Sequence, residues 1–104
     1  MTSTPTTAAW VVTGPTSGFG RATALELAHH GHVVLVGRNP DKLAAVEAEI
    51  EQAGSTATSI VADLSDVAGA RRAAAQIAAL GLPVRGVVNN AGVLLTKPGV
   101  SPQG

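Results

Sequence analysis

The sequence has no cysteine and no tyrosine, and aromatic residues make up only 2% of its 104 residues. Without cysteine, it cannot form a disulfide framework, a thiolate nucleophile or a thiolate zinc site. Net charge is also missing, because 7 basic side chains balance 7 acidic ones. This balance leaves no electrostatic footprint for DNA, RNA or an anionic membrane, so we expect no nucleic-acid or membrane partner.

Long hydrophobic runs are missing too, since stretches such as residues 33–36 are far shorter than the roughly 20 residues of a membrane-spanning helix. Residues 1–7 carry no Lys or Arg, unlike the start of a secretory signal, and we expect them to be a disordered lead-in. A chain of this length forms one hydrophobic core. We therefore predict a single cytoplasmic domain over residues 8–92, followed by an irregular tail over residues 93–104.

Short apolar runs alternate along the chain with segments of helical periodicity. Strands are expected at residues 8–13, 32–36, 58–62 and 86–89, and helices at residues 19–30, 40–53 and 67–79. Each connection between strands is long enough to hold a helix, which predicts an α/β fold with a doubly wound parallel sheet. In such folds the ligand binds at the carboxyl ends of the strands.

A glycine pattern, G-x-x-x-G-x-G, follows the first expected strand and opens directly into a helix. Gly14 permits a tight turn, Gly18 lets the backbone approach a pyrophosphate, and Gly20 allows close packing of helix on strand. Free N–H groups at the helix N-terminus add donors and the positive end of the helix dipole. An ordinary glycine-rich turn is the alternative, but the position between strand and helix favours phosphate binding. Ser17 is expected to donate a hydrogen bond to a phosphate or at the helix end.

Two further loops carry charged side chains. Arg38 follows the second strand, near where a carboxylate usually binds the free ribose 2′-hydroxyl of NAD. Its planar guanidinium suits a 2′-phosphate, which predicts NADP rather than NAD, although a solvated surface arginine is the alternative. Asp63 ends the third strand, where it could accept a hydrogen bond from an adenine amino group beside Leu64 or merely cap the following turn.

The fourth strand ends in Asn89-Asn90-Ala91-Gly92. Amide side chains at this point can tie neighbouring strands together. The small Ala91 and Gly92 leave room beside a ribose and a nicotinamide.

Three histidines stand close together at His29, His30 and His32. Gly31 interrupts the expected helix between them, so they cannot share one helical face. We therefore expect no metal site.

Together these loops resemble the N-terminal half of the short-chain dehydrogenase/reductase family. That family shows T-G-x-x-x-G-x-G after the first strand, an aspartate after the third and N-N-A-G after the fourth. The Gly37-Arg38 pair matches its NADP-preferring variant, and the Gly-Phe-Gly-Arg segment resembles its retinol-dehydrogenase-like branch. The resemblance implies a Rossmann-like fold that binds NADP through Gly14, Thr16, Ser17, Phe19, Arg38, Asp63, Leu64, Asn90 and Ala91, to which the glycine patterns add Gly18, Gly20 and Gly92.

The sequence also departs from this family, whose members transfer hydride between the nicotinamide and an alcohol or carbonyl with a Tyr-x-x-x-Lys pair. It contains no tyrosine, and its last lysine, Lys97, stands in the expected tail. We therefore expect a truncated Rossmann-like sheet that binds the cofactor, with no catalytic residue and no hydride transfer by this chain alone. A stand-alone dinucleotide-binding or sensing module and a non-functional truncated gene product are the alternatives. The helices that usually build the family's dimers are missing, so oligomerisation stays open.

Overall fold

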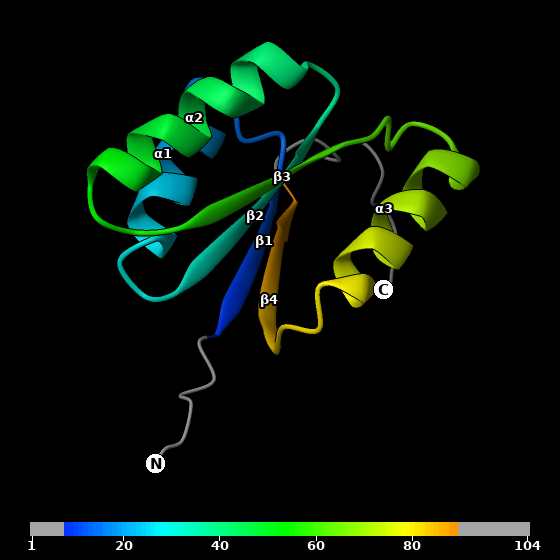
Figure 1. The fold of residues 1–104 in the computed structure, drawn as a ribbon. Helices are drawn as coiled ribbons and strands as arrows, with labels where there is room; N and C mark the ends of the chain where they lie inside the picture. Colours follow the sequence, from blue (N-terminus) through cyan, green and yellow to red (C-terminus); the bar gives the residue numbers. More distant parts are fainter. Residues whose placement is uncertain (1–7, 90–104) are drawn as a thin grey trace.

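A computed structural model describes residues 8–89 of the protein. Its elements follow one another as β1 (Ala9–Thr13), α1 (Gly18–Leu27), β2 (His32–Gly37), α2 (Pro40–Gln52), β3 (Ala57–Val61), α3 (Val67–Ala79) and β4 (Val84–Asn89). The four strands form one parallel sheet in the order β3-β2-β1-β4, which confirms the predicted α/β fold (Figure 1). The lead-in over residues 1–7 and the tail over residues 93–104 lie outside the described residues.

Helices cover both faces of the sheet, with α1 and α2 on one side and α3 on the other (Figure 1). Strand β2 is buried on both faces, because Val33 and Leu35 join the core under α1 and α2 while Val34 and Val36 join the core under α3. This double burial explains why the strand is a continuous apolar run. The spacing of Leu43, Val46 and Ile50 in the sequence, at intervals of three and four, predicts one apolar face for α2, and these three are its buried residues.

Helix α1 ends at Leu27, three residues before the predicted end. The chain then makes a tight turn, in which the His30 N–H donates to the Leu27 carbonyl at 2.8 Å. Gly31 lets this turn pass close to the start of β1, because a Cβ atom there would lie 2.2 Å from the Ala8 carbonyl oxygen. The glycine therefore marks a close approach between two backbones, and the helix has ended before it.

The structure corrects the predicted apolar face of α3. The helical spacing of Val67, Ala70, Ala74 and Ile77 in the sequence predicts one apolar face, and only Ile77 of these packs against the core. Val67 is 67% exposed, Ala70 and Ala74 are exposed, and the buried residues are Gly69 and Ala73. A Cβ atom at Gly69 would lie 1.9 Å from the Asp63 carbonyl oxygen, so the glycine lets the helix approach the preceding loop closely. This close approach turns the Gly69 and Ala73 face toward the sheet.

The amino-terminal edge of the sheet carries His32, whose ring nitrogens lie 2.7 and 2.8 Å from the hydroxyl oxygens of Thr56 and Thr58. Burial lowers the pKa of His32, and the Glu47 carboxylate opposes this shift. Within residues 8–89, no three His, Cys, Asp or Glu side chains are grouped so as to hold a metal ion. In the same part of the chain, no helix has the length and hydrophobicity needed to span a bilayer.

Candidate functional site

The glycine loop joins β1 to α1 at the carboxyl end of the sheet, and each glycine in it has its own geometry. Gly14 has a φ of 64°, in the left-handed region that favours glycine. A Cβ atom at Gly20 would lie 2.0 Å from the Gly14 carbonyl oxygen, so the start of α1 packs directly on the turn. A Cβ atom at Gly18 would meet nothing within 4 Å, so the backbone at this position is open to an incoming group.

Ser17 holds this loop together as the N-cap of α1. Its Oγ accepts a hydrogen bond from the Gly20 N–H at 3.0 Å and donates one to the Gly14 carbonyl at 3.2 Å. The first bond satisfies a backbone donor that the first turn of a helix cannot pair internally. Ser17 thus forms hydrogen bonds at the helix end, which was one of the two roles predicted for it. The other role, contact with a phosphate, stays a prediction.

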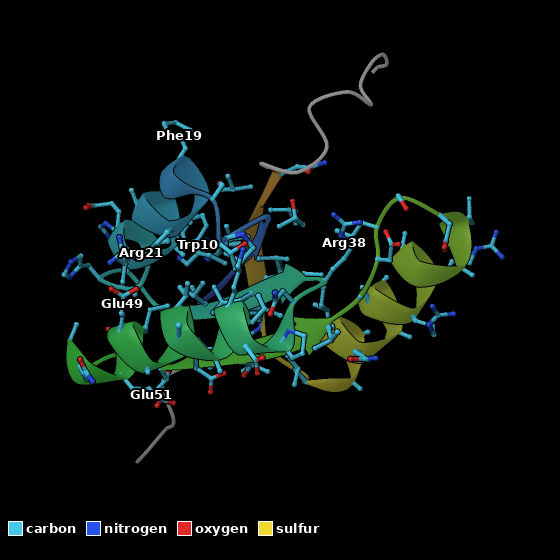
Figure 2. All side chains as sticks on the ribbon, turned by 90° about the horizontal axis from the view of Figure 1, so that it is seen from above. Trp10, Phe19, Arg21, Arg38, Glu49 and Glu51 are labelled. Carbon is cyan, nitrogen blue, oxygen red and sulfur yellow. The ribbon has the colours of Figure 1, made fainter. Side chains whose placement is uncertain are left out.

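Two side chains of the loop are exposed, Thr16 and, at 79%, Phe19. Figure 2 shows the Phe19 ring pointing away from α1, at the outer end of the helix. The part of the loop that faces the carboxyl ends of the other strands is therefore its backbone and not the Phe19 ring.

Arg38 lies in the short loop between β2 and α2. Gly37 before it packs over the side chain of Leu43, since a Cβ atom at Gly37 would lie 3.3 Å from Leu43 Cδ2. Asn39 after it is the N-cap of α2, and its Oδ1 accepts hydrogen bonds from the Asp41 and Lys42 N–H groups. Arg38 itself is exposed and reaches from the end of β2 toward the loop that enters α3 (Figure 2).

Asp63 stands in that next loop, between β3 and α3. Its Oδ1 accepts hydrogen bonds from the Ser65 hydroxyl at 2.6 Å and the Ser65 N–H at 2.9 Å. These two bonds, and in smaller measure the positive charge of Arg38, lower the pKa of Asp63. Asp63 therefore caps the following turn, which was one of the two alternatives for it. The same hydrogen bonds favour the ionised form of its carboxylate. The adenine contact stays a prediction.

Thr13 and Asn89 join the carboxyl ends of β1 and β4. The Thr13 hydroxyl, in a residue that is 6% exposed, donates a hydrogen bond to Asn89 Oδ1 at 2.8 Å. The prediction that an amide at the end of the fourth strand ties neighbouring strands together is confirmed at this position. The other predicted residues of this loop, Asn90, Ala91 and Gly92, lie outside the described residues.

One open cleft of about 1060 Å³ runs along this edge of the sheet. The predicted residues that line it are Gly14, Thr16, Arg38, Asp63 and Leu64. Asn39, Pro40, Lys42 and Ser65 also line it and were missed as site residues from the sequence, although Pro40 and Asp41 indicated that a helix starts here. Ser17, Gly18, Phe19 and Gly20 do not line the cleft, and they form or adjoin the loop at its end.

Comparison of the sequence with known proteins gives a consistent result. The sequence model of the family described as short chain dehydrogenase matches residues 8–103. Polyprenol dehydrogenase of Mus musculus is 39% identical over 90 residues, which cover 82% of this chain and 26% of that protein. The 3beta-hydroxysteroid dehydrogenase of Mediterraneibacter gnavus is 40% identical over 85 residues, covering 81% of this chain and 31% of that protein. The chain thus spans about a quarter to a third of the length of these relatives.

Solved structures show the same similarity in three dimensions. A 3-oxoacyl (acyl-carrier-protein) reductase from Agrobacterium tumefaciens, with NADP bound, matches with a TM-score of 0.73 and 36% identity, covering 81% of this chain and 33% of that chain. An actinorhodin polyketide ketoreductase with NADPH matches with a TM-score of 0.76 and 31% identity, covering 83% of this chain and 33% of the other. Both neighbours carry a nicotinamide dinucleotide in their structures.

Proposed function

Because this chain belongs to the short-chain dehydrogenase family, we propose that it binds NADP along the carboxyl ends of β1, β2 and β3. The observation that carries this proposal is the convergence of the glycine loop, Arg38 and Asp63 on one cleft. Each of these groups has a chemical counterpart in the dinucleotide, and the cleft is large enough for a ligand of that size. The NADP-bound neighbours support the assignment by similarity.

The residues present fit the two ends of such a ligand. The open backbone at Gly18, the turn at Gly14 and the N-terminus of α1 would hold the pyrophosphate, because N–H groups and the helix dipole favour an anion there. Asp63 and Leu64 would border the adenine. Asn90, Ala91 and Gly92 are proposed to border the ribose and nicotinamide.

Arg38 is proposed to select NADP over NAD. An NAD-binding site of this kind places a carboxylate after the second strand to accept hydrogen bonds from the ribose hydroxyls, and this chain has an exposed guanidinium there. The guanidinium can donate two parallel hydrogen bonds to a phosphate. Arg38 stays exposed in the structure, although its positive charge is near enough to contribute to the lowered pKa of Asp63.

The reaction proposed for the whole protein is the family's hydride transfer between NADP and an alcohol or carbonyl, in which the bound cofactor supplies or accepts the hydride. The proton that accompanies the hydride needs an acid or base held at the substrate. The family uses a tyrosine for this purpose, and these 104 residues contain none. The function proposed for this chain is therefore to bind and orient the cofactor.

Arg38→Asp tests the cofactor assignment. The wild-type chain is expected to bind NADPH more tightly than NADH, because only NADPH has a 2′-phosphate for the guanidinium. The variant should lose roughly tenfold or more in NADPH affinity, as a charge-assisted contact becomes a repulsive one. Titration calorimetry with both ligands measures this ratio.

Arg72→Asp is the matched control, because Arg72 is equally an exposed arginine but lies on α3, outside the residues that line the cleft. It makes the same charge change and should keep the NADPH preference. Equal affinities of the wild-type chain for NADPH and NADH would overturn the role of Arg38.

A further inference from the structure

The first turn of α2 forms one wall of the cleft, and it carries a second positive charge. Pro40 is the first residue of the helix, and Lys42 is the third. Both line the same cleft as Arg38. The lining of the cleft therefore includes an ammonium group in addition to the guanidinium.

Lys42 stands where a helix disfavours a cation. The N-terminal turn is the positive end of the helix dipole, and acidic residues are favoured there. With Asn39 as N-cap, residue 42 is the N3 position, at which a glutamate could complete a capping box by reaching back to the N-cap N–H. A lysine at this position opposes the dipole and forgoes this bond, so helix stability does not explain it.

The ammonium group of Lys42 is also not used within the fold. Among residues 8–89 it makes no ion pair and no hydrogen bond, whereas Arg21 on α1 pairs with Glu49 on α2 (Figure 2). Lys42 is exposed at the cleft. A positive charge that lowers the local helix stability, has no internal partner and lines a cleft is placed to meet an anion that enters the cleft.

We propose that Lys42 is a second cation of the 2′-phosphate site and, with Arg38, determines the preference for NADP. This inference rests on the proposed NADP binding. A phosphate monoester carries nearly two negative charges at neutral pH, so one guanidinium leaves part of its charge without a counter-charge. The two side chains differ in what they supply: Arg38 offers a planar pair of donors, and Lys42 a mobile point charge.

Lys42→Gln and Lys42→Glu test this role together with the wild-type chain. Titrations use NADPH, NADH and adenosine 2′,5′-bisphosphate, which carries the 2′-phosphate without the nicotinamide. Lys42→Gln is expected to lower the affinities for NADPH and for the bisphosphate roughly fivefold to tenfold, and Lys42→Glu should lower them further. The affinity for NADH should stay within about twofold of the wild-type value. Arg72→Gln, which removes a positive charge on α3, is expected to leave all three affinities unchanged.

Thermal unfolding separates this role from a structural one. Because the lysine opposes the dipole, Lys42→Gln should leave the melting temperature equal or higher, and Lys42→Glu should raise it. If the wild-type chain prefers NADPH and the Lys42→Gln variant keeps the same preference, the role of Lys42 is overturned and the proposed function stays intact. A wild-type chain that binds neither dinucleotide overturns the proposed function and this inference with it.

Discussion

Gly20→Ala is expected to lower the free energy of unfolding by about 2–3 kcal/mol, although it adds a single methyl group. The new Cβ atom would lie 2.0 Å from the Gly14 carbonyl oxygen and 3.0 Å from the Gly14 carbonyl carbon. Both are backbone atoms of the turn, so they cannot move aside as a flexible side chain would. Relief requires α1 to shift away from β1 and to break the Ser17 cap. Urea denaturation followed by the fluorescence of Trp10, the single tryptophan, measures the loss.

Gly18→Ala is the matched control for this prediction, because it adds the same methyl group two residues earlier in the loop. Its Cβ atom would meet nothing within 4 Å. Stability should therefore be unchanged or rise by up to about 1 kcal/mol, since alanine favours the helix more than glycine does. NADPH affinity should nevertheless fall, because the methyl group points into open space where the proposed pyrophosphate would approach. Equal stabilities of the two variants would contradict the packing described for Gly20.

Leu43→Ala is expected to cost about 2–5 kcal/mol of the free energy of unfolding. Leu43 is fully buried in the core between α2 and the sheet, together with residues of β1, β2 and α1. Its removal leaves a cavity that the surrounding side chains fill only in part. A loss of this size is a large share of the stability typical of a small domain. Circular dichroism during thermal and urea unfolding measures it.

A second consequence of Leu43→Ala concerns the site, because the Leu43 side chain supports Gly37 directly before Arg38. NADPH affinity should fall along with stability. Leu80→Ala is the control: this leucine at the C-cap of α3 is 37% exposed, and its truncation should cost less than about 1 kcal/mol. A Leu43→Ala loss no larger than the Leu80→Ala loss would contradict the described core.

Most of the fold follows from local signals in the sequence. Proline at the first helical position, as at Pro40, and aspartate just before a helix, as at Asp66, are typical of helix starts. In the structure the Asp66 Oδ1 accepts the Gly69 N–H. The continuous apolar run of β2 is typical of a strand buried on both faces. These signals are readable because capping and strand burial depend on residues that are close together in the chain.

Features set by contacts between distant segments were harder to predict. The buried face of α3 depends on the close approach of Gly69 to the Asp63 carbonyl, and periodicity alone grouped Ile77 with exposed neighbours and not with Gly69 and Ala73. The glycine pattern and Arg38 could be recognised because each follows a strand. Lys42 stands only four residues after Arg38 and lines the same cleft, but no motif marks an exposed lysine in the first turn of a helix as a site residue.

The central claim is that NADP binds at the carboxyl edge of the sheet. Titration of the ¹⁵N-labelled chain with NADPH, followed by the amide signals, tests it most directly. We predict that shifts concentrate at Gly14, Gly18 and Arg38 and in the loop that holds Asp63, with none at the opposite edge around His32. Shifts centred on the amino-terminal edge, or unchanged spectra at saturating NADPH, would contradict the account.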